Sequence, residues 1–348
     1  MIDLCIQELT EIIRGHLRLG SMPPLGGEME PVGRVVVDLR NVQPGDVFLA
    51  LETAEHDSAA RADIAFAAGA QGVVVDGQHV EPWAGKFSIV VEDTACALWQ
   101  LAAWSRRRFL GQVIAVTGDA GRSTTAKMID AVLCRRFVGA MSARDSAGSL
   151  ALRLSMLALN AAHDFGVVEY AAGQRGRFRT LSHLCSPDIA VINCVANHET
   201  PDSDSAFYES ETLDSLSDDG WAVLNGDVTR RHGIAKRLES RVVLVGRTSH
   251  CDVVAYDVRS RLGELSFVSD GVSFLVPVQG RHYLHSALAA IAVGRIMDIS
   301  TDDIAEALSR FRLHQSKTKD LSEASPFVSC MRELGTALPP GSKHHACW

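Results

Sequence analysis

The sequence predicts an α/β protein of two domains, a small N-terminal α/β domain followed by a larger domain with a mostly parallel sheet. Apolar strands and amphipathic helices alternate from residue 113 to about residue 312. This alternation is typical of a parallel sheet with helices on both faces. Residues 113–133 read as a buried strand, a glycine-containing loop and a helix, the arrangement of a phosphate-binding loop.

Composition is that of a globular protein. The 348 residues suffice for about two to three domains of ordinary size. Hydrophobic residues make up 47% of the chain and charged residues 22%, which is enough for a normal apolar core. The net charge of −8 argues against a nucleic-acid or membrane-surface binder, because both need a basic face. Eight scattered cysteines without a C-x-x-C pair disfavour a structural zinc site and a disulfide framework, and they fit a reducing compartment. We find neither a signal peptide nor a run of about 18 apolar residues, so we expect a soluble, cytoplasmic protein.

The first domain is expected to span residues 1–106. Its predicted helices are an amphipathic one at 1–13, an alanine-rich one at 61–70 and a third at 96–108. Its predicted strands are the apolar runs 34–37, 46–51, 72–75 and 87–91. The arginine cluster 106–108 marks a hinge to the second domain.

The second domain is expected to span residues 107–312. Its predicted parallel strands lie at 113–116, 166–169, 188–193, 221–225 and 241–245. Residues 252–279 alternate like antiparallel strands, with turns at Gly263 and at Asp270–Gly271. Helices are expected at 123–133, 283–297 and 302–311, the last capped by Ser300 or Thr301. The tail, residues 313–348, is polar and is expected to be irregular.

The loop at 118–125 carries the candidate chemistry. Gly118 and Gly121 shape a turn whose free N–H groups and following helix dipole attract an anion. Ser123 follows the basic residue directly and offers a hydroxyl to Mg²⁺. The basic residue is Arg122, whereas phosphate loops use the compact ammonium of lysine. A guanidinium still pairs with phosphate oxygens in a bidentate manner.

Six segments, in the same order, are similar to motifs of the Mur ligase family. They are residues 37–51 (family D-S-R…P-G-D-L/V-F-x-A-L), 67–75 (a helix-to-strand segment), 117–125 (T-G-T/S-x-G-K-T/S-T/S), 169–198 (E-x-G…P-D-x-A-V-I-T-N…H), 223–227 (L-N-x-D-D) and 280–290 (G-x-H-N-x-x-N-A-L-A-A). Any one of them is a common pattern. Six in register identify the chain as resembling this family, and most closely its branch that adds D-alanyl-D-alanine to a UDP-muramoyl-tripeptide.

The resemblance implies an ATP-dependent acid–amino acid ligase of peptidoglycan synthesis. In such ligases ATP phosphorylates a substrate carboxylate, and the incoming amino group attacks the acyl phosphate. The implied cofactors are ATP and Mg²⁺, and the first domain is then a UDP-sugar domain. Carried over by position, the implied roles are phosphate binding by Gly118, Gly121, Arg122 (also catalytic) and Thr124, metal binding by Ser123, Glu169 and His198, nucleotide contact by Asn225, Asp227 and His282, and uridine-side binding by Arg40.

The departures from the family pattern fall on the chemistry. Arg122 replaces lysine, Tyr283 and Ser286 replace two asparagines, and Leu39 replaces the uridine-side serine. Residues 209–213 lack the lysine that the family carries about fourteen residues after the metal histidine, and residues 142–149 lack the asparagine-rich substrate loop. The residues after 312 do not match the family's C-terminal domain. We therefore expect weak or no turnover by the chain alone, unless a partner protein supplies that domain; a truncated reading frame is also open.

Two functional hypotheses remain open at this point. One is a ligase for a UDP-muramoyl-type or related carboxylate; the other is a non-catalytic homologue that binds a nucleotide, a UDP-sugar or a protein partner. For single residues the structural alternatives are a glycine turn with a serine cap at 118–125, a strand-end acid at Glu169, a loop histidine at His198 and turn formers at Asn225 and Asp227. A kinase or GTPase lacks support, because no N-K-x-D motif is present.

Overall fold

The computed structural model describes residues 4–51, 58–77, 80–118, 121–142, 149–169, 175–193, 210–227, 241–313 and 327–330. The chain forms two compact units. One consists of residues 1–109 with 156–160, and the other of residues 110–155 with the chain from 161 on.

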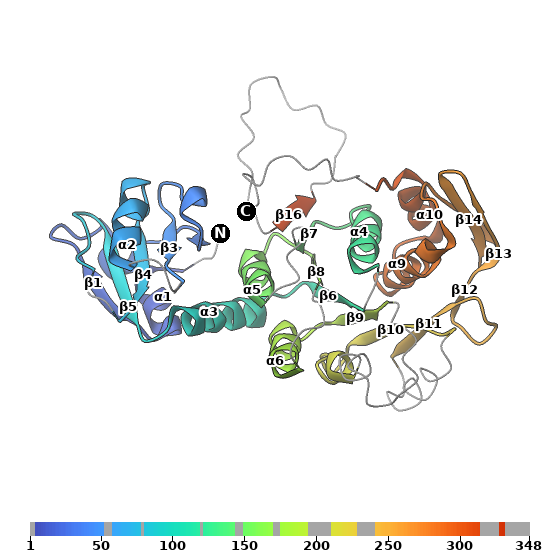
Figure 1. Ribbon diagram of the computed structural model, residues 1–348, viewed down its shortest axis with the longest axis horizontal. Coiled ribbons are helices and arrows are strands. Elements are labelled where there is room, and N and C mark those ends of the chain that lie inside the picture. Colours follow the sequence, from blue (N-terminus) through green and yellow to red (C-terminus); the bar gives the residue numbers. More distant parts are fainter. Residues whose placement is uncertain are drawn as a thin grey trace, which may run out of the picture. The chain divides into compact units, whose positions relative to one another are not determined.

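The N-terminal unit is built on a five-stranded sheet of order β1-β5-β4-β3-β2, in which only β1 is antiparallel to its neighbour (Figure 1). Its strands are β1 (His16–Leu19), β2 (Val35–Val36), β3 (Val47–Leu49), β4 (Gly72–Asp76) and β5 (Phe87–Val91). Its helices are α1 (Ile6–Ile13), α2 (Ser58–Ala67) and α3 (Thr94–Arg108), with short 3₁₀ turns η1 (Gly27–Met29) and η2 (Leu39–Asn41). The four expected strands are present, and β1 is an additional strand that the sequence pattern did not indicate.

A glycine opposite a phenylalanine fixes strand register in both units. Gly72 pairs with Phe87, and a Cβ atom on Gly72 would lie 2.2 Å from the Phe87 ring. In the second unit Gly139 pairs with Phe165, and a Cβ atom on Gly139 would lie 2.2 Å from that ring. Each ring therefore lies across the backbone of the facing strand, where only glycine leaves room.

The second unit is built on an eight-stranded sheet of order β12-β11-β10-β9-β6-β8-β7-β16. Its strands are β6 (Gln112–Thr117), β7 (Gly139–Ser142), β8 (Phe165–Glu169), β9 (Ile189–Ile192), β10 (Trp221–Asn225), β11 (Val242–Gly246), β12 (Val253–Val254) and β16 (Phe327–Cys330). All pairs are parallel except β16 with β7. The short strand β16 lies in the tail, which the sequence predicted to be irregular, so this part of the prediction is wrong. A run of four residues is too short for its sequence pattern to predict a strand.

The helices of this unit pack on the sheet, and Figure 1 shows α4 beside α9. They are α4 (Arg122–Leu133), α5 (Ser149–Ala158), α6 (Arg175–Cys185), α9 (Leu284–Ile296) and α10 (Thr301–Arg310), with a 3₁₀ turn η3 (Arg281–Tyr283) before α9. The Ser300 hydroxyl accepts from the Asp303 amide, so Ser300 rather than Thr301 caps α10. A single apolar core joins α4, α9 and α10 to the sheet, and Ile129, Leu288 and Ile304 lie within it.

The antiparallel segment also agrees with expectation. Strands β13 (Tyr256–Arg261), β14 (Glu264–Ser269) and β15 (Val272–Val276) form a separate three-stranded sheet. Its two turns place Gly263, Asp270 and Gly271 at positive φ, as their sequence suggested.

Among the described cysteines, Cys5, Cys96, Cys185 and Cys251 are free thiols, whereas Cys134 is disulfide-bonded. No helix within the described residues is long and apolar enough to cross a membrane.

The half-buried Asp130 on α4 generates a pH-dependent prediction. Burial raises the pKa of Asp130 to about 7. Between the unfolded value of about 3.9 and 7, the folded state holds a proton that the unfolded state has released, so stability falls as the pH rises through this window and then levels off. Asp130→Asn should therefore stabilise the protein at pH 8, by at most about 4 kcal/mol, and have little effect at pH 4.

Urea unfolding at the two pH values measures this difference. The same substitution at the exposed Asp218, Asp218→Asn, is measured beside it as the control variant. Equal effects of Asp130→Asn at pH 4 and pH 8 would contradict the assignment.

Candidate functional site

The loop between β6 and α4 leaves a helix N-terminus without a side-chain cap. Gly118 follows β6 with φ 130°, and Gly121 precedes α4 with φ 75°. Gly121 is the N-cap residue and makes no side-chain cap hydrogen bond. Asp119 and Ala120 lie outside the described residues. Because the first N–H groups of a helix have no intrahelical acceptor, this terminus is suited to an anion.

Arg122 is the first residue of α4, one position earlier than the predicted helix start at Ser123. Its guanidinium folds back over the loop, and Nη1 donates a hydrogen bond to the Gly118 carbonyl oxygen. Its Nε is buried and has no hydrogen-bond partner among the described residues. A positive charge with an unused buried donor therefore lies over the loop, where an anion would bind.

Ser123 and Glu169 come together at the same edge of the sheet. Glu169 ends β8 and pairs in register with Val116 of β6, so it lies level with the start of the loop. The Ser123 hydroxyl donates a hydrogen bond of 2.6 Å to Glu169 Oε2. The Glu169 amide in turn donates to Ser142 Oγ over 3.2 Å.

These two oxygen ligands fit a magnesium ion, which prefers hydroxyl, carboxylate and water oxygens. His198, the third predicted ligand, lies outside the described residues. No group of three or more histidine, cysteine or acidic side chains with metal-site geometry occurs in the described part of the chain. The geometry thus brings together two of the three predicted metal-side residues.

A buried polar cluster lies beneath Gly121, and sequence reasoning did not single it out. Thr125 Oγ1 accepts a hydrogen bond of 2.8 Å from Asn193 Nδ2 and lies 2.8 Å from Ser286 Oγ. Thr125, Asn193 and Ser286 come from α4, the end of β9 and α9, and all three are buried. Thr124 lies one residue before this cluster, in the first turn of α4, and is half-buried.

Asn225 is the last residue of β10 and Asp227 lies in the turn that follows, and both side chains form hydrogen bonds within the protein. The Asp227 amide donates to Asn225 Oδ1 over 3.0 Å. The Asp227 carboxylate accepts from the Arg247 and Thr248 amides at 2.8 and 3.1 Å, and it lies 3.1 Å from His285 Nε2. Burial raises the pKa of Asp227, but the hydrogen bonds from the Arg247 amide, from His285 and from Thr248 outweigh burial and lower the pKa overall. Asp227 thus braces the turn after β11 and anchors α9.

His282 and Arg40 are both exposed. The His282 ring contacts the Tyr283 ring, with centroids 4.0 Å apart, in the turn before α9. Arg40 belongs to the N-terminal unit, where its side chain is 78% exposed and pairs with Asp38 at 2.6 Å. The hydrogen bond from Arg40 holds the pKa of Asp38 below its ordinary value.

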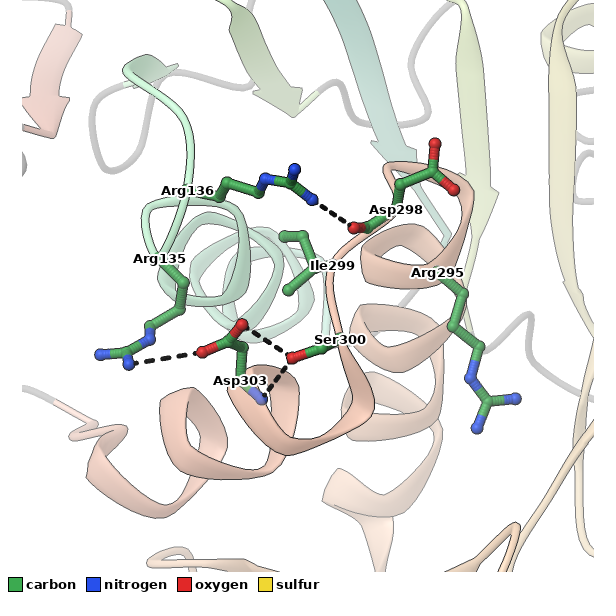
Figure 2. A pocket seen from close by; sticks show the side chains of 7 residues that line it. All are labelled: Arg135, Arg136, Arg295, Asp298, Ile299, Ser300 and Asp303. Carbon is green, nitrogen blue, oxygen red and sulfur yellow. Dashed lines mark hydrogen bonds and ion pairs between the residues drawn. The ribbon is translucent and has the colours of Figure 1, made fainter.

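A cavity of about 600 Å³ lies at the other end of α4, and Figure 2 shows its lining. The lining residues are Arg135, Arg136, Arg295, Asp298, Ile299, Ser300 and Asp303. Arg136 Nη1 donates to the carbonyl oxygen of Asp298, two residues after the end of α9, over 2.7 Å. None of the predicted site residues lines this cavity, which is separated from Arg122 by the length of α4, about 18 Å at 1.5 Å per residue.

The Mur ligase middle domain matches residues 116–294, just over half of the chain. The chain belongs to the Mur ligase family.

Relatives within the Mur ligase family agree with this assignment. The chain is 28% identical to the UDP-N-acetylmuramoyl-tripeptide–D-alanyl-D-alanine ligase of Bacillus subtilis, over 99% of this chain and 74% of that relative. The fold is similar to MurF from Acinetobacter baumannii, with a TM-score of 0.76, 23% identity and coverage of 90% of this chain and 69% of that one. It is also similar to the MurF ligase of Thermotoga maritima solved in complex with ADP, with a TM-score of 0.68, 22% identity and coverage of 80% and 66%.

Two contacts in this candidate site had no clear signal in the sequence. Asn193 follows an apolar strand, where asparagine is also an ordinary strand-end residue. His285 stands in the variable part of the 280–290 motif, and its pairing with Asp227 depends on residues 58 positions apart. Positional matching found the loop, but these contacts depend on tertiary structure.

Proposed function

We propose that this chain acts in UDP-muramoyl-peptide synthesis as an ATP-dependent acid–amino acid ligase that proceeds through an acyl phosphate. Support comes from its membership of the Mur ligase family, from the Bacillus subtilis relative that is a ligase of this kind, and from the ADP complex of the Thermotoga maritima ligase. The observation that carries the proposal is the buried, unpartnered Nε of Arg122 above an uncapped helix N-terminus.

Arg122 takes the part of the lysine in this proposal. Leaving a buried donor unsatisfied costs about 1–3 kcal/mol, and a phosphate oxygen at this position removes that cost. The backbone at Gly118, Gly121 and Thr124 surrounds the same anion. Planar guanidinium groups bind phosphate oxygens in pairs, so Arg122 holds two oxygens where an ammonium acts as a point charge.

Ser123, Glu169 and His198 hold Mg²⁺ in this proposal, and the ion, when bound, neutralises phosphate charge as the substrate carboxylate is phosphorylated. The direct Ser123–Glu169 hydrogen bond keeps the two oxygens converged. On the nucleotide side we place His282, with Asn225 and Asp227 shaping the loops beside it.

The domain assignment remains part of the proposal. Residues 1–106 form a UDP-sugar domain in which Arg40 lies on the uridine side, and residues 107–312 form the ATP-binding domain. The exposure of Arg40 leaves its guanidinium accessible to a ligand even while it pairs with Asp38.

A second candidate function is nucleotide or UDP-sugar binding without turnover. The hydrogen bonds of Asp227 favour this function, because its carboxylate is already bound by the Arg247 and Thr248 amides and by His285 rather than held ready for a ligand. Arg122 also favours binding without turnover, because its planar guanidinium places the positive charge differently from the ammonium of lysine. Each electrostatic group that acts on a transition state contributes about 3 kcal/mol or more, so a displaced charge slows the reaction.

The first prediction concerns nucleotide binding. Mg·ATP at 100 times Kd should stabilise the wild type by about 2.7 kcal/mol, a rise of a few degrees in Tm. Arg122→Ala should abolish most of this rise, whereas Arg122→Lys should retain much of it, because the charge remains. Differential scanning fluorimetry across a Mg·ATP titration measures all three proteins.

Arg136→Ala is the matched control, since this arginine lies at the other end of α4 and should leave the Mg·ATP effect unchanged. Absence of a rise in the wild type, or an equal rise in wild type and Arg122→Ala, would contradict nucleotide binding at this loop.

The second prediction separates the ligase from the binding module. A ligase should release ADP only when both a UDP-muramoyl-peptide and D-alanyl-D-alanine are present, and Glu169→Gln should suppress that release. Coupled ADP detection, with and without the C-terminal part of the Bacillus subtilis relative added in trans, measures it. Mg·ATP binding with no ADP release in either condition would favour the binding module.

A further inference from the structure

Asn193 contacts both ends of the loop that carries the proposed phosphate site. At the first end, the Asn193 backbone amide donates to the Thr117 carbonyl oxygen over 2.9 Å, and Thr117 is the last residue of β6. At the second end, its side-chain Nδ2 donates to Thr125 Oγ1 over 2.8 Å, in the first turns of α4. One residue, directly after β9, thus bridges the residues before and after the loop.

The side chain of Asn193 also fits against Gly121. A Cβ atom placed on Gly121 would lie 2.7 Å from Asn193 Nδ2, which is closer than real contacts allow. Gly121 itself has φ 75°, a conformation that suits glycine. The amide of Asn193 therefore occupies the space directly beneath the residue that begins the helix.

The Thr125 hydroxyl group depends on the Asn193 side-chain amide as its hydrogen-bond donor. The Thr125 hydroxyl has one proton, and it lies 2.9 Å from the Gly121 carbonyl oxygen and 2.8 Å from Ser286 Oγ. Its remaining capacity is as an acceptor, and Asn193 fills it. Because Thr125 is fully buried, water cannot replace the amide at no cost.

We propose that Asn193 is the positioning residue of the phosphate loop. It fixes the separation of Thr117 and Gly121, and hence the direction of the first N–H groups of α4, without touching the nucleotide itself. Through Thr125 it also ties the loop to Ser286 on α9, the helix that follows His282. This inference rests on the proposed nucleotide function of the loop.

The test compares Asn193→Ala with Val191→Ala. Val191 lies two residues earlier, on β9, and is buried in the apolar core, so its truncation lowers stability while it leaves the hydrogen bonds from Asn193 to Thr117 and Thr125 in place. Two quantities are measured for each full-length protein: the Kd for Mg·ATP by calorimetric titration, and the hydrogen-exchange rates of the amides from 121 to 125 without nucleotide.

Asn193→Ala should raise Kd by between about ten- and a hundredfold, as expected when binding groups move by up to 1 Å, and it should speed exchange selectively at the loop. Val191→Ala should change Kd less than about twofold despite a lower Tm. Thr125→Val removes the same hydrogen bond from the other side and should reproduce the effect, which preserves the test if Asn193→Ala does not fold.

An equal rise in Kd for the Asn193→Ala and Val191→Ala variants, or no rise for either, would overturn the positioning role. If the wild type binds no Mg·ATP, the proposed function fails, but the exchange measurement still tests the positioning role of Asn193. Faster exchange confined to the loop of Asn193→Ala supports that role, and unchanged exchange contradicts it.

Discussion

The parallel pairing of β6 with β8 on one side and β9 on the other is the constraint on which the candidate site depends. Val116 lies level with Glu169, and Thr117 lies level with Ile192, so three strands end at the same edge of the sheet. The loops that leave this edge necessarily start side by side, which is where open α/β sheets place their ligands. The Ser123–Glu169 and Thr125–Asn193 hydrogen bonds both depend on this common edge.

Arg122 changes the chemical character of the loop. Its larger, planar head has five N–H donors to satisfy, and the loop provides an acceptor for one of them at the Gly118 carbonyl. The buried Nε remains unpartnered among the described residues. The site therefore favours an anionic ligand, since a positive charge and the unpartnered Nε of Arg122 lie at a helix N-terminus that has no side-chain cap.

Sequence patterns predicted the fold well where the apolar runs were long. The central strands, the α4 and α9 helices and the antiparallel segment all follow from period and from turn residues such as Gly263. Short strands such as β1 and β16 escaped, because pairing with a neighbour rather than local pattern defines them. The family also followed from the sequence, because six motifs in register carry more information than any one element.

The candidate site was only partly accessible from the sequence. The family motifs pointed to Arg122, Ser123 and Glu169, and the fold brings these residues near one another, since strand ends in a parallel sheet converge. The motifs could not show that Asp227 is engaged by the turn after β11, or that Asn193 supports Gly121 from below. Such contacts join residues far apart in the chain, and a polar residue at a strand end gives the same signal whether it binds a ligand or its own protein.

The most direct test of the account is a crystal structure of the full chain grown with Mg²⁺ and a non-hydrolysable ATP analogue. The account predicts that the triphosphate lies on the N-terminus of α4 and that the Arg122 guanidinium leaves the Gly118 carbonyl to bind phosphate oxygens, with Nε among its donors. A structure in which the analogue is absent from this loop at saturating concentration, with Arg122 still on Gly118, would contradict it.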